Sequence, residues 1–178
     1  MKDLKKIVFI ACCCMLLPML FPVFVSGQSA PSAAEEEAIA MINQIYTEVS
    51  SEGDRQVDWD RVRSFFAEEA LIILRTSREG STRFTVEGFI RDFQDFYRSP
   101  AMNESGFKEE VLRLKSEIYH DIAFIAVVYE ASILKSERPP QKGIDFWLLT
   151  RTDSGWKVAA VTNEIIPPGE EIPGMFGD

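Results

Sequence analysis

Apolar positions in the first half of the chain recur at the period of an α-helix. The first such stretch follows residue 35 and comprises Ala38, Ile42, Ile45 and Val49. Steps of three and four residues place these side chains on one face, so an amphipathic helix is predicted there. Shorter helices are predicted after Asp58 and Thr85, because both side chains can cap a helix N-terminus. Pro100 ends the last of the three.

Between and after these helices the pattern is typical of β-strands. A continuous apolar run covers residues 71–74, and residues 82–84 follow it after a polar turn. Further strands are predicted at residues 108–119, 122–134, 144–151 and 156–165. Helices with a strand between them, then a four-strand meander, predict an α+β fold with an antiparallel sheet.

Four ordered segments resemble the nuclear transport factor two-like superfamily, which includes SnoaL-like and ketosteroid-isomerase-like proteins. They are residues 57–66 followed by the strand 71–74, the helix start at 85–90, the strand at 143–149, and the run Asp153-Ser154-Gly155-Trp156-Lys157-Val158. The resemblance covers roughly residues 35–166 and implies a curved antiparallel sheet wrapped around the N-terminal helices, a cystatin-like cone. The interior of such cones is often a pocket. Members include isomerases, dehydratases, cyclases and binding or scaffold domains, so the resemblance predicts the fold better than the chemistry.

The N-terminus has the layout of a signal peptide. Three lysines within residues 2–6 precede an apolar run at residues 7–25, and small residues follow it, so cleavage is predicted after Gly27. The chain would then be exported, to a periplasm or outside the cell. An uncleaved membrane anchor is an alternative, since the run is just long enough to span a bilayer. A lipoprotein cleaved before Cys12 ranks lower, because the apolar stretch continues beyond that cysteine.

We expect residues 28–34 to form a flexible lead-in, residues 35–166 the cone-shaped domain, and residues 167–178 an irregular acidic tail. The whole chain of 178 residues carries a net charge of −9. Loss of residues 1–27 removes three lysines and one aspartate, so the charge becomes −11. Such a charge argues against nucleic acid and, after cleavage, against an anionic membrane.

Composition removes several classes of catalyst. All three cysteines lie at positions 12–14, so the mature chain has no disulfide, thiol nucleophile or thiolate ligand. The only histidine is His120, which excludes a histidine-rich metal site. No metal constellation and no cofactor motif is found. His120 is a candidate general base, but its place in a predicted two-residue turn with Asp121 favours a surface position.

The register of that hairpin assigns side chains to two faces. A two-residue turn pairs Tyr119 with Ile122 and Val111 with Glu130, which puts Tyr129 on the core face together with Leu112 and Leu114. Glu130 then lies outside beside two cations, while an odd turn would reverse the faces. The outer face also holds Phe124, Ala126 and Val128. A half-apolar outer face suggests cover by a second copy, so a homodimer is expected.

Asp145, Trp147 and Asn163 are candidates whose face depends on the last hairpin. A three-residue loop places all three on the solvent side with Lys157. A four-residue loop brings Asp145 and Trp147 onto the face of Trp156, inside the cone. Asp145 would then be a candidate general base.

Aromatic side chains complete the candidate site. Tyr46, Trp59, Tyr97 and Tyr129 are candidates to line the cone and to bind a small apolar ligand, together with Trp147 and Asn163. The first hypothesis is an exported small-ligand-binding domain. The alternatives are an isomerase- or dehydratase-type enzyme with Asp145 or His120 as base, and an interaction domain that acts through a sheet-face dimer.

Overall fold

The three predicted helices form, and side-chain caps begin each of them. In the computed structural model, residues 30–177 are described except 53–55, 78–79, 101 and 103–104. α1 (Ala33–Val49) is capped by Ser32, whose side chain accepts a hydrogen bond from the backbone N–H of Glu35. The caps of α2 (Trp59–Ser64) and α3 (Val86–Arg98) are Asp58 and Thr85, which confirms both predicted starts.

The chain divides into two units at Pro31, and the fold described here is that of the unit from residue 31 onward. α1 begins two residues before the predicted boundary at 35. The predicted signal peptide, with its three cysteines, lies outside the described residues. None of the helices in the described part of the chain is long and apolar enough to cross a membrane.

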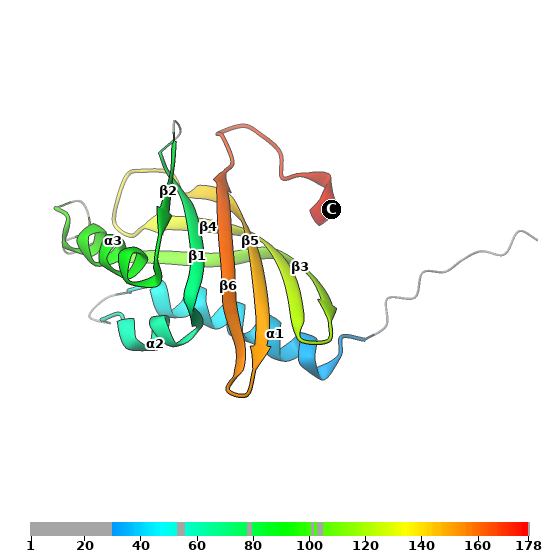
Figure 1. The fold of residues 1–178 in the computed structure, drawn as a ribbon. Helices are drawn as coiled ribbons and strands as arrows, with labels where there is room; N and C mark the ends of the chain where they lie inside the picture. The colour runs from blue at the N-terminus through cyan, green and yellow to red at the C-terminus, as the bar shows by residue number, and fades with distance from the viewer. Residues whose placement is uncertain (1–29, 53–55, 78–79, 101, 103–104, 178) are drawn as a thin grey trace, which may run out of the picture. The chain divides into compact units, whose positions relative to one another are not determined.

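Six strands form one curved sheet, in the order β2-β1-β6-β5-β4-β3 (Figure 1). Their bounds are β1 (Phe66–Ser77), β2 (Gly80–Phe84), β3 (Phe107–Tyr119), β4 (Ile122–Ile133), β5 (Gln141–Thr152) and β6 (Gly155–Ile165). The last four form the predicted meander. The predicted α+β fold with a curved antiparallel sheet is confirmed, and one strand pair differs from the rest, because β1 pairs with β6 in parallel. The first strand therefore joins the sheet beside the last.

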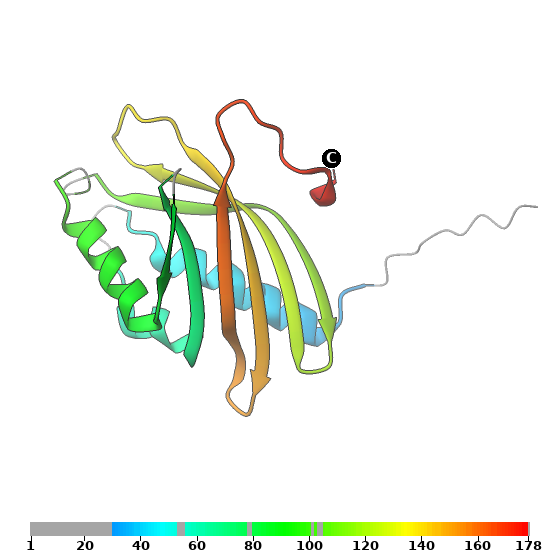
Figure 2. The ribbon, with the colours of Figure 1, turned by 45° about the horizontal axis from the view of Figure 1, so that its top comes forward.

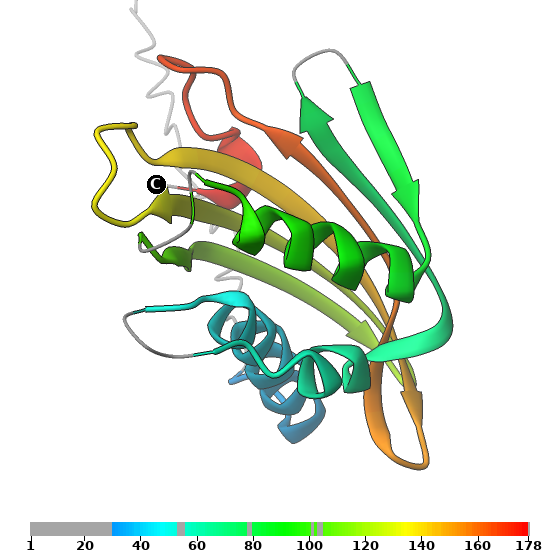
Figure 3. The same cartoon turned by 90° about the vertical axis from the view of Figure 1, so that its left-hand side faces the viewer.

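The helices lie on one side of the sheet, and the main core lies between the two layers (Figure 3). Ala38, Ile42 and Ile45 of α1 are almost fully buried there, as their helical spacing predicts. Ile72, Ile125 and Val158 meet them from three strands. One face of the sheet is thus the inner wall of a cone.

A β-bulge in β3 corrects the predicted register of the first hairpin. The turn does pair Tyr119 with Ile122, but Leu112 is an extra residue, so Val111 rather than Leu112 lies opposite Tyr129. Leu112 is 42% exposed instead of buried. Because side chains alternate along a strand, one extra residue at Leu112 reverses the predicted face of each residue that precedes it in β3. Glu130 stays outside, where its carboxylate lies 3.9 Å from the ammonium of Lys142.

A second bulge lies in β6. Leu148 pairs with Ala160 and Leu149 with Val158, which leaves Ala159 without a partner. The hairpin itself closes with Thr152 opposite Gly155, an even-length turn that gives the same faces as the predicted four-residue loop.

The outer face of the sheet is partly covered by this chain's own tail. Phe176, in the short 3-10 helix η1 (Gly174–Phe176), is buried against Ala126 and Val128. Figure 2 shows the chain leaving β6 and turning back toward the neighbouring strands, with η1 near its end. The guanidinium of Arg113 also donates a hydrogen bond to the carbonyl of Gly177. The tail therefore supplies part of the cover that the sequence pattern assigns to a second copy.

Candidate functional site

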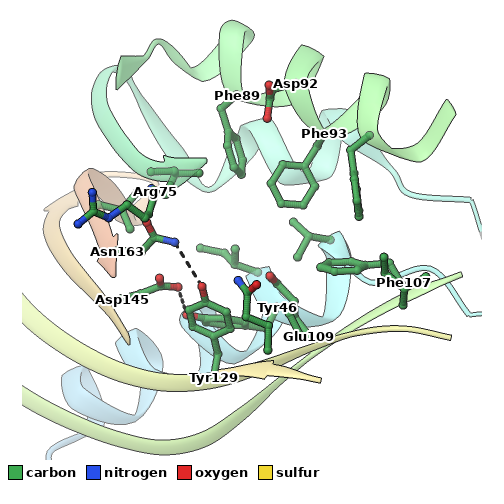
Figure 4. Close-up of a pocket in the computed structure, with 18 of the residues that line it drawn as sticks. Tyr46, Arg75, Phe89, Asp92, Phe93, Phe107, Glu109, Tyr129, Asp145 and Asn163 are labelled. Atoms are coloured by element: carbon green, nitrogen blue, oxygen red, sulfur yellow. Dashed lines mark hydrogen bonds between the residues drawn. The ribbon is translucent and has the colours of Figure 1, made fainter. Parts of the chain in front are cut away.

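The concave side of the sheet encloses a cavity of about 630 Å³ (Figure 4). Its walls come from α1, α3, the strands β1 and β3 to β6, and the loop before β5. They are mostly apolar and aromatic, and include Ile45, Val49, Leu74, Phe89, Phe93, Phe96, Phe107, Ile133 and Val161. A cavity of this volume with few polar groups is of the usual size and character for a small-molecule site.

Asp145 lies at the polar end of this cavity. It is 7% exposed, and its carboxylate accepts a hydrogen bond from the hydroxyl of Tyr46 on α1. The indole N–H of Trp147 donates to the same tyrosine oxygen over 3.3 Å. Trp147 and Asp145 project from the same face of β5, so the three groups form one chain of hydrogen bonds from Trp147 through Tyr46 to Asp145.

Burial determines the protonation of both partners. Removal from water raises the pKa of Asp145 from 3.8 to about 7, while the hydrogen bond from Tyr46 acts in the opposite direction. Burial, and then the charge of Asp145, hold the pKa of Tyr46 well above its usual value. Tyr46 thus remains a hydrogen-bond donor, and Asp145 is a carboxyl that can gain or lose its proton near neutral pH.

A second tyrosine, Tyr129 of β4, lines the cavity beside Tyr46. The side-chain amide of Asn163 donates to the hydroxyl oxygen of Tyr129 over 3.2 Å, and its carbonyl oxygen accepts from the backbone N–H of Arg75 at 2.5 Å. The bulge at Ala159 is what turns Asn163 inward, because the uninterrupted alternation places it outside. Asn163 therefore orients the phenol of Tyr129, whose own proton remains available to the cavity.

The ring of Tyr129 passes over a glycine on the neighbouring strand. A Cβ atom at Gly143 would lie 2.3 Å from the hydroxyl oxygen of Tyr129. Gly143 pairs with Tyr129 in the register of β4 and β5, so the missing side chain is what makes room for the phenol.

Glu109 is a site residue that the sequence pattern did not reveal. The bulge at Leu112 turns Glu109 into the cavity, whereas the unbroken register keeps it outside. The residue has intermediate exposure, and its side chain is among those that line the cavity (Figure 4). Burial, and then the charge of Asp145, raise the pKa of Glu109 from 4.5 to about 8. The sequence does contain one sign that Glu109 faces inward. Phe107 lies two positions earlier in the strand, so it shares a face with Glu109, and it is an aromatic residue that the structure buries.

Charged groups near the cavity rim are paired or exposed. The Nε–H and an Nη2–H of Arg75 donate to the two carboxylate oxygens of Glu164, each over 2.8 Å. Arg138 is exposed on the loop between β4 and β5. Asp92 of α3 is also exposed, and burial together with its neighbour Asp95 raises the pKa of its carboxyl.

The structure separates the candidate residues into two groups. Tyr46, Tyr129, Trp147, Asp145 and Asn163 all line the cavity. The remaining three candidates lie elsewhere.

Trp59 and Tyr97 are not among the lining residues, which corrects their expected place in the pocket. The rings of these two residues pack together with centroids 5.9 Å apart, and the hydroxyl of Tyr97 donates to the carbonyl of Val49. Each ring also packs against a residue of the cavity wall, Trp59 against Phe93 of α3 and Tyr97 against Phe107 of β3.

His120 is also outside the site. It is exposed in the β3–β4 turn with a φ of 52°, the left-handed conformation that such turns require. The structure therefore places His120 outside the cavity, at the surface position that the turn pattern favours. No cluster of three or more metal-ligating side chains occurs within the described residues.

Comparison with solved structures finds the same fold in other proteins. A cystatin-like-fold protein of unknown function from Nostoc punctiforme is 10% identical, with a TM-score of 0.59, over 79% of this chain and 97% of its own. An NTF2-like, cystatin-like-fold protein from Novosphingobium aromaticivorans is 12% identical, with a TM-score of 0.61, over 75% of this chain and 82% of its own. The same organism has a candidate aromatic ring hydroxylase that is 16% identical, with a TM-score of 0.60, over 79% and 94% of the two chains.

These likenesses show that the chain has the NTF2-like, cystatin-like α+β fold, as its resemblance implies. No protein-family model matches the chain, and no curated protein matches it by sequence.

Proposed function

We propose that the cone binds one small, largely apolar molecule in its cavity. The observation that carries this proposal is an aromatic-walled space of about 630 Å³ into which a few polar groups, among them Asp145 and Asn163, project. An empty space of that size would leave many ring atoms without packing partners, so a ligand that fills it gains dispersion and hydrophobic energy.

Native mass spectrometry of the purified protein tests this proposal directly, with an added small-molecule mass expected on the chain. In parallel, the neutral dye Nile red should bind and gain fluorescence. Ala131→Phe fills the cavity and should weaken dye binding about tenfold or more, since it replaces apolar ligand contacts. Ser132→Phe is the matched control, because Ser132 pairs with Lys108 on the other face. Equal dye binding by both variants would contradict the proposal.

A second candidate function is proton transfer, of the isomerase or dehydratase kind, and one observation favours it. Asp145 is a buried carboxyl whose pKa of about 7 suits a general base at neutral pH. The phenol of Tyr129, oriented by Asn163, can donate a hydrogen bond to the oxygen that becomes negative when a carbon proton is removed.

Exchange of the α-protons of 2-tetralone into D₂O, followed by NMR, tests proton transfer without knowledge of the natural substrate. We expect the protein to accelerate exchange, and Asp145→Asn to reduce that acceleration about a hundredfold, the usual contribution of a positioned base. The rate should rise through about pH 7 as Asp145 ionises. His120→Ala should leave the rate unchanged, because His120 lies in an exposed turn. Unchanged exchange in Asp145→Asn would reject this candidate.

A homodimer through the outer face of the sheet is a separate proposal. Leu71 and Leu148 are 40% and 51% exposed there, beyond the area that the tail covers. Leu148→Lys should shift a dimer to monomer in analytical ultracentrifugation, because a desolvated ammonium opposes association. A sample that sediments only as monomer at micromolar concentration would argue against the dimer.

Export is likewise proposed from the sequence of residues 1–27. Expression in a bacterial host, followed by fractionation and N-terminal sequencing, should give a product that begins at Gln28. A chain that retains Met1 in the membrane fraction would favour the anchor instead.

A further inference from the structure

Glu109 is a cavity carboxyl that neither the binding proposal nor proton transfer uses. The hydroxyl of Ser50, at the C-terminus of α1, fixes its backbone, because it accepts from the N–H of Glu109 at 2.9 Å. The carboxyl itself projects into the cavity (Figure 4). Within the described residues it has no hydrogen bond and no ion pair. The site thus holds a second acid that has no hydrogen-bond or ion-pair partner among the residues that the structure describes.

Among the described residues that line the cavity, no cation pairs with Glu109. The titratable and charged groups that share the cavity are Tyr46 of α1, Arg75 of β1, Asp92 of α3, Tyr129 of β4, Asp145 of β5 and Arg138 of the β4–β5 loop. Arg75 is paired with Glu164, and Arg138 is exposed. The described part of the cavity therefore has acidic groups inside and its two cations at the edge.

We infer that the ligand of this cavity carries a protonated amine, which pairs with the carboxylate of Glu109 while its apolar body packs against the aromatic walls. This inference rests on the proposed binding function, since it names the chemical class of the bound molecule. The rings of Tyr46 and Tyr129 lie 6.1 Å apart beside the acids and offer electron-rich faces to a cation.

Each alternative ligand class fits the site less well. An anionic ligand would lie next to Asp145 and Glu109 and be repelled. A neutral ligand would leave both carboxyls without a counter-charge in an apolar space, which favours their protonated forms. An ammonium group on the ligand relieves this cost, because it supplies a counter-charge that also donates hydrogen bonds to the carboxylates.

Proton release is a consequence that can be measured. Near neutral pH the carboxyls of Glu109 and Asp145 are partly protonated, since burial raises their pKa values to about 8 and about 7. An ammonium that pairs with them favours ionisation, so binding of an amine should release protons and should strengthen as the pH rises from 6 to 8. A neutral ligand should release none.

Three probes of matched shape separate these classes: tryptamine, which is cationic, tryptophol, which is neutral, and indole-3-acetate, which is anionic. Isothermal titration calorimetry at pH 7.5, in two buffers of different ionisation enthalpy, gives both affinity and proton release. We expect tryptamine to bind about tenfold or more tightly than tryptophol, the factor that corresponds to recovery of one unit of pKa shift. Indole-3-acetate should bind most weakly.

Glu109→Gln should lower the affinity for tryptamine by about the same factor and leave that for tryptophol unchanged. Glu110→Gln is the matched control, because Glu110 is the next residue on β3 and is exposed on the other face. Two results overturn the inference but leave the binding proposal intact. They are equal affinity of the wild type for tryptamine and tryptophol, and an affinity for tryptamine that is unchanged by Glu109→Gln. If none of the three probes binds, both the binding proposal and the inference of an amine ligand fail.

Discussion

The stability of the protein should fall as the pH rises from 5 to 8, opposite to the trend of proteins whose acids are paired. Glu109 has its pKa raised from 4.5 to about 8, so the folded state holds a proton that the unfolded state has already released. Because the folded state binds more protons across this range, each unit of pH disfavours it by about 1.4 kcal/mol per carboxyl. The contribution is complete below pH 4.5 and is lost as the pH approaches 8.

The magnitude follows from the two buried acids. Glu109 alone accounts for about 4 kcal/mol between pH 5 and 8, and Asp145 for about 2 kcal/mol between pH 5 and its pKa of about 7. Part of the Glu109 shift comes from the charge of Asp145, so the two effects are not additive. We expect a combined loss of about 5 kcal/mol, which is a large share of the stability of a typical domain.

Urea unfolding followed by tryptophan fluorescence measures this effect, since Trp147 and Trp156 are both buried. Glu109→Gln should match the wild type at pH 5 and exceed its stability by about 3 kcal/mol at pH 8, because the amide has no proton to lose. Glu110→Gln should follow the wild-type curve. A wild-type stability that is flat or rises from pH 5 to 8, or a Glu109→Gln curve parallel to it, would refute the reasoning.

Three further substitutions test the rest of the site and the tail. Tyr46→Phe removes the hydrogen bond to Asp145 and should raise the pKa of that carboxyl by about one unit, as read from its ¹³C NMR titration. Gly143→Ala should destabilise the protein by about 2 kcal/mol in urea unfolding, because its methyl group overlaps a tyrosine ring, whereas Gly80→Ala, which meets no atom within 4 Å, should not. Phe176→Ala should cost about 2 kcal/mol in the same assay if the tail packs on the sheet as described.

Local pattern predicts most of the elements of this fold and some of its polar site. Helical spacing reveals the buried stripe of α1, and the capping residues Asp58 and Thr85 locate the other two helix starts. The tyrosine at position 46 belongs to that buried stripe, so its inward direction follows from periodicity alone. The hairpin at His120 is also predicted correctly, because turn chemistry is local.

Strand register is where prediction fails, and the failures lie at the site itself. Leu112 and Ala159 are each one extra residue in a strand, and neither leucine nor alanine is a residue type that predicts a bulge. Each bulge reverses the faces beyond it, which brings Glu109 and Asn163 into the cavity. An account based on unbroken alternation therefore misses one carboxyl completely and places the amide on the wrong side.

The sequence by itself determined the class of fold, the helices and their caps, and the presence of an apolar interior, because these depend on short-range periodicity and steric preference. Only the tertiary structure decided which polar groups share that interior. Asp145 and Tyr46 are 99 positions apart, and their meeting depends on how α1 crosses the sheet. The tail's contact with the outer face is also long-range. The raised pKa values follow from the same cause, since burial of a carboxyl is a property of the packed layers rather than of any segment.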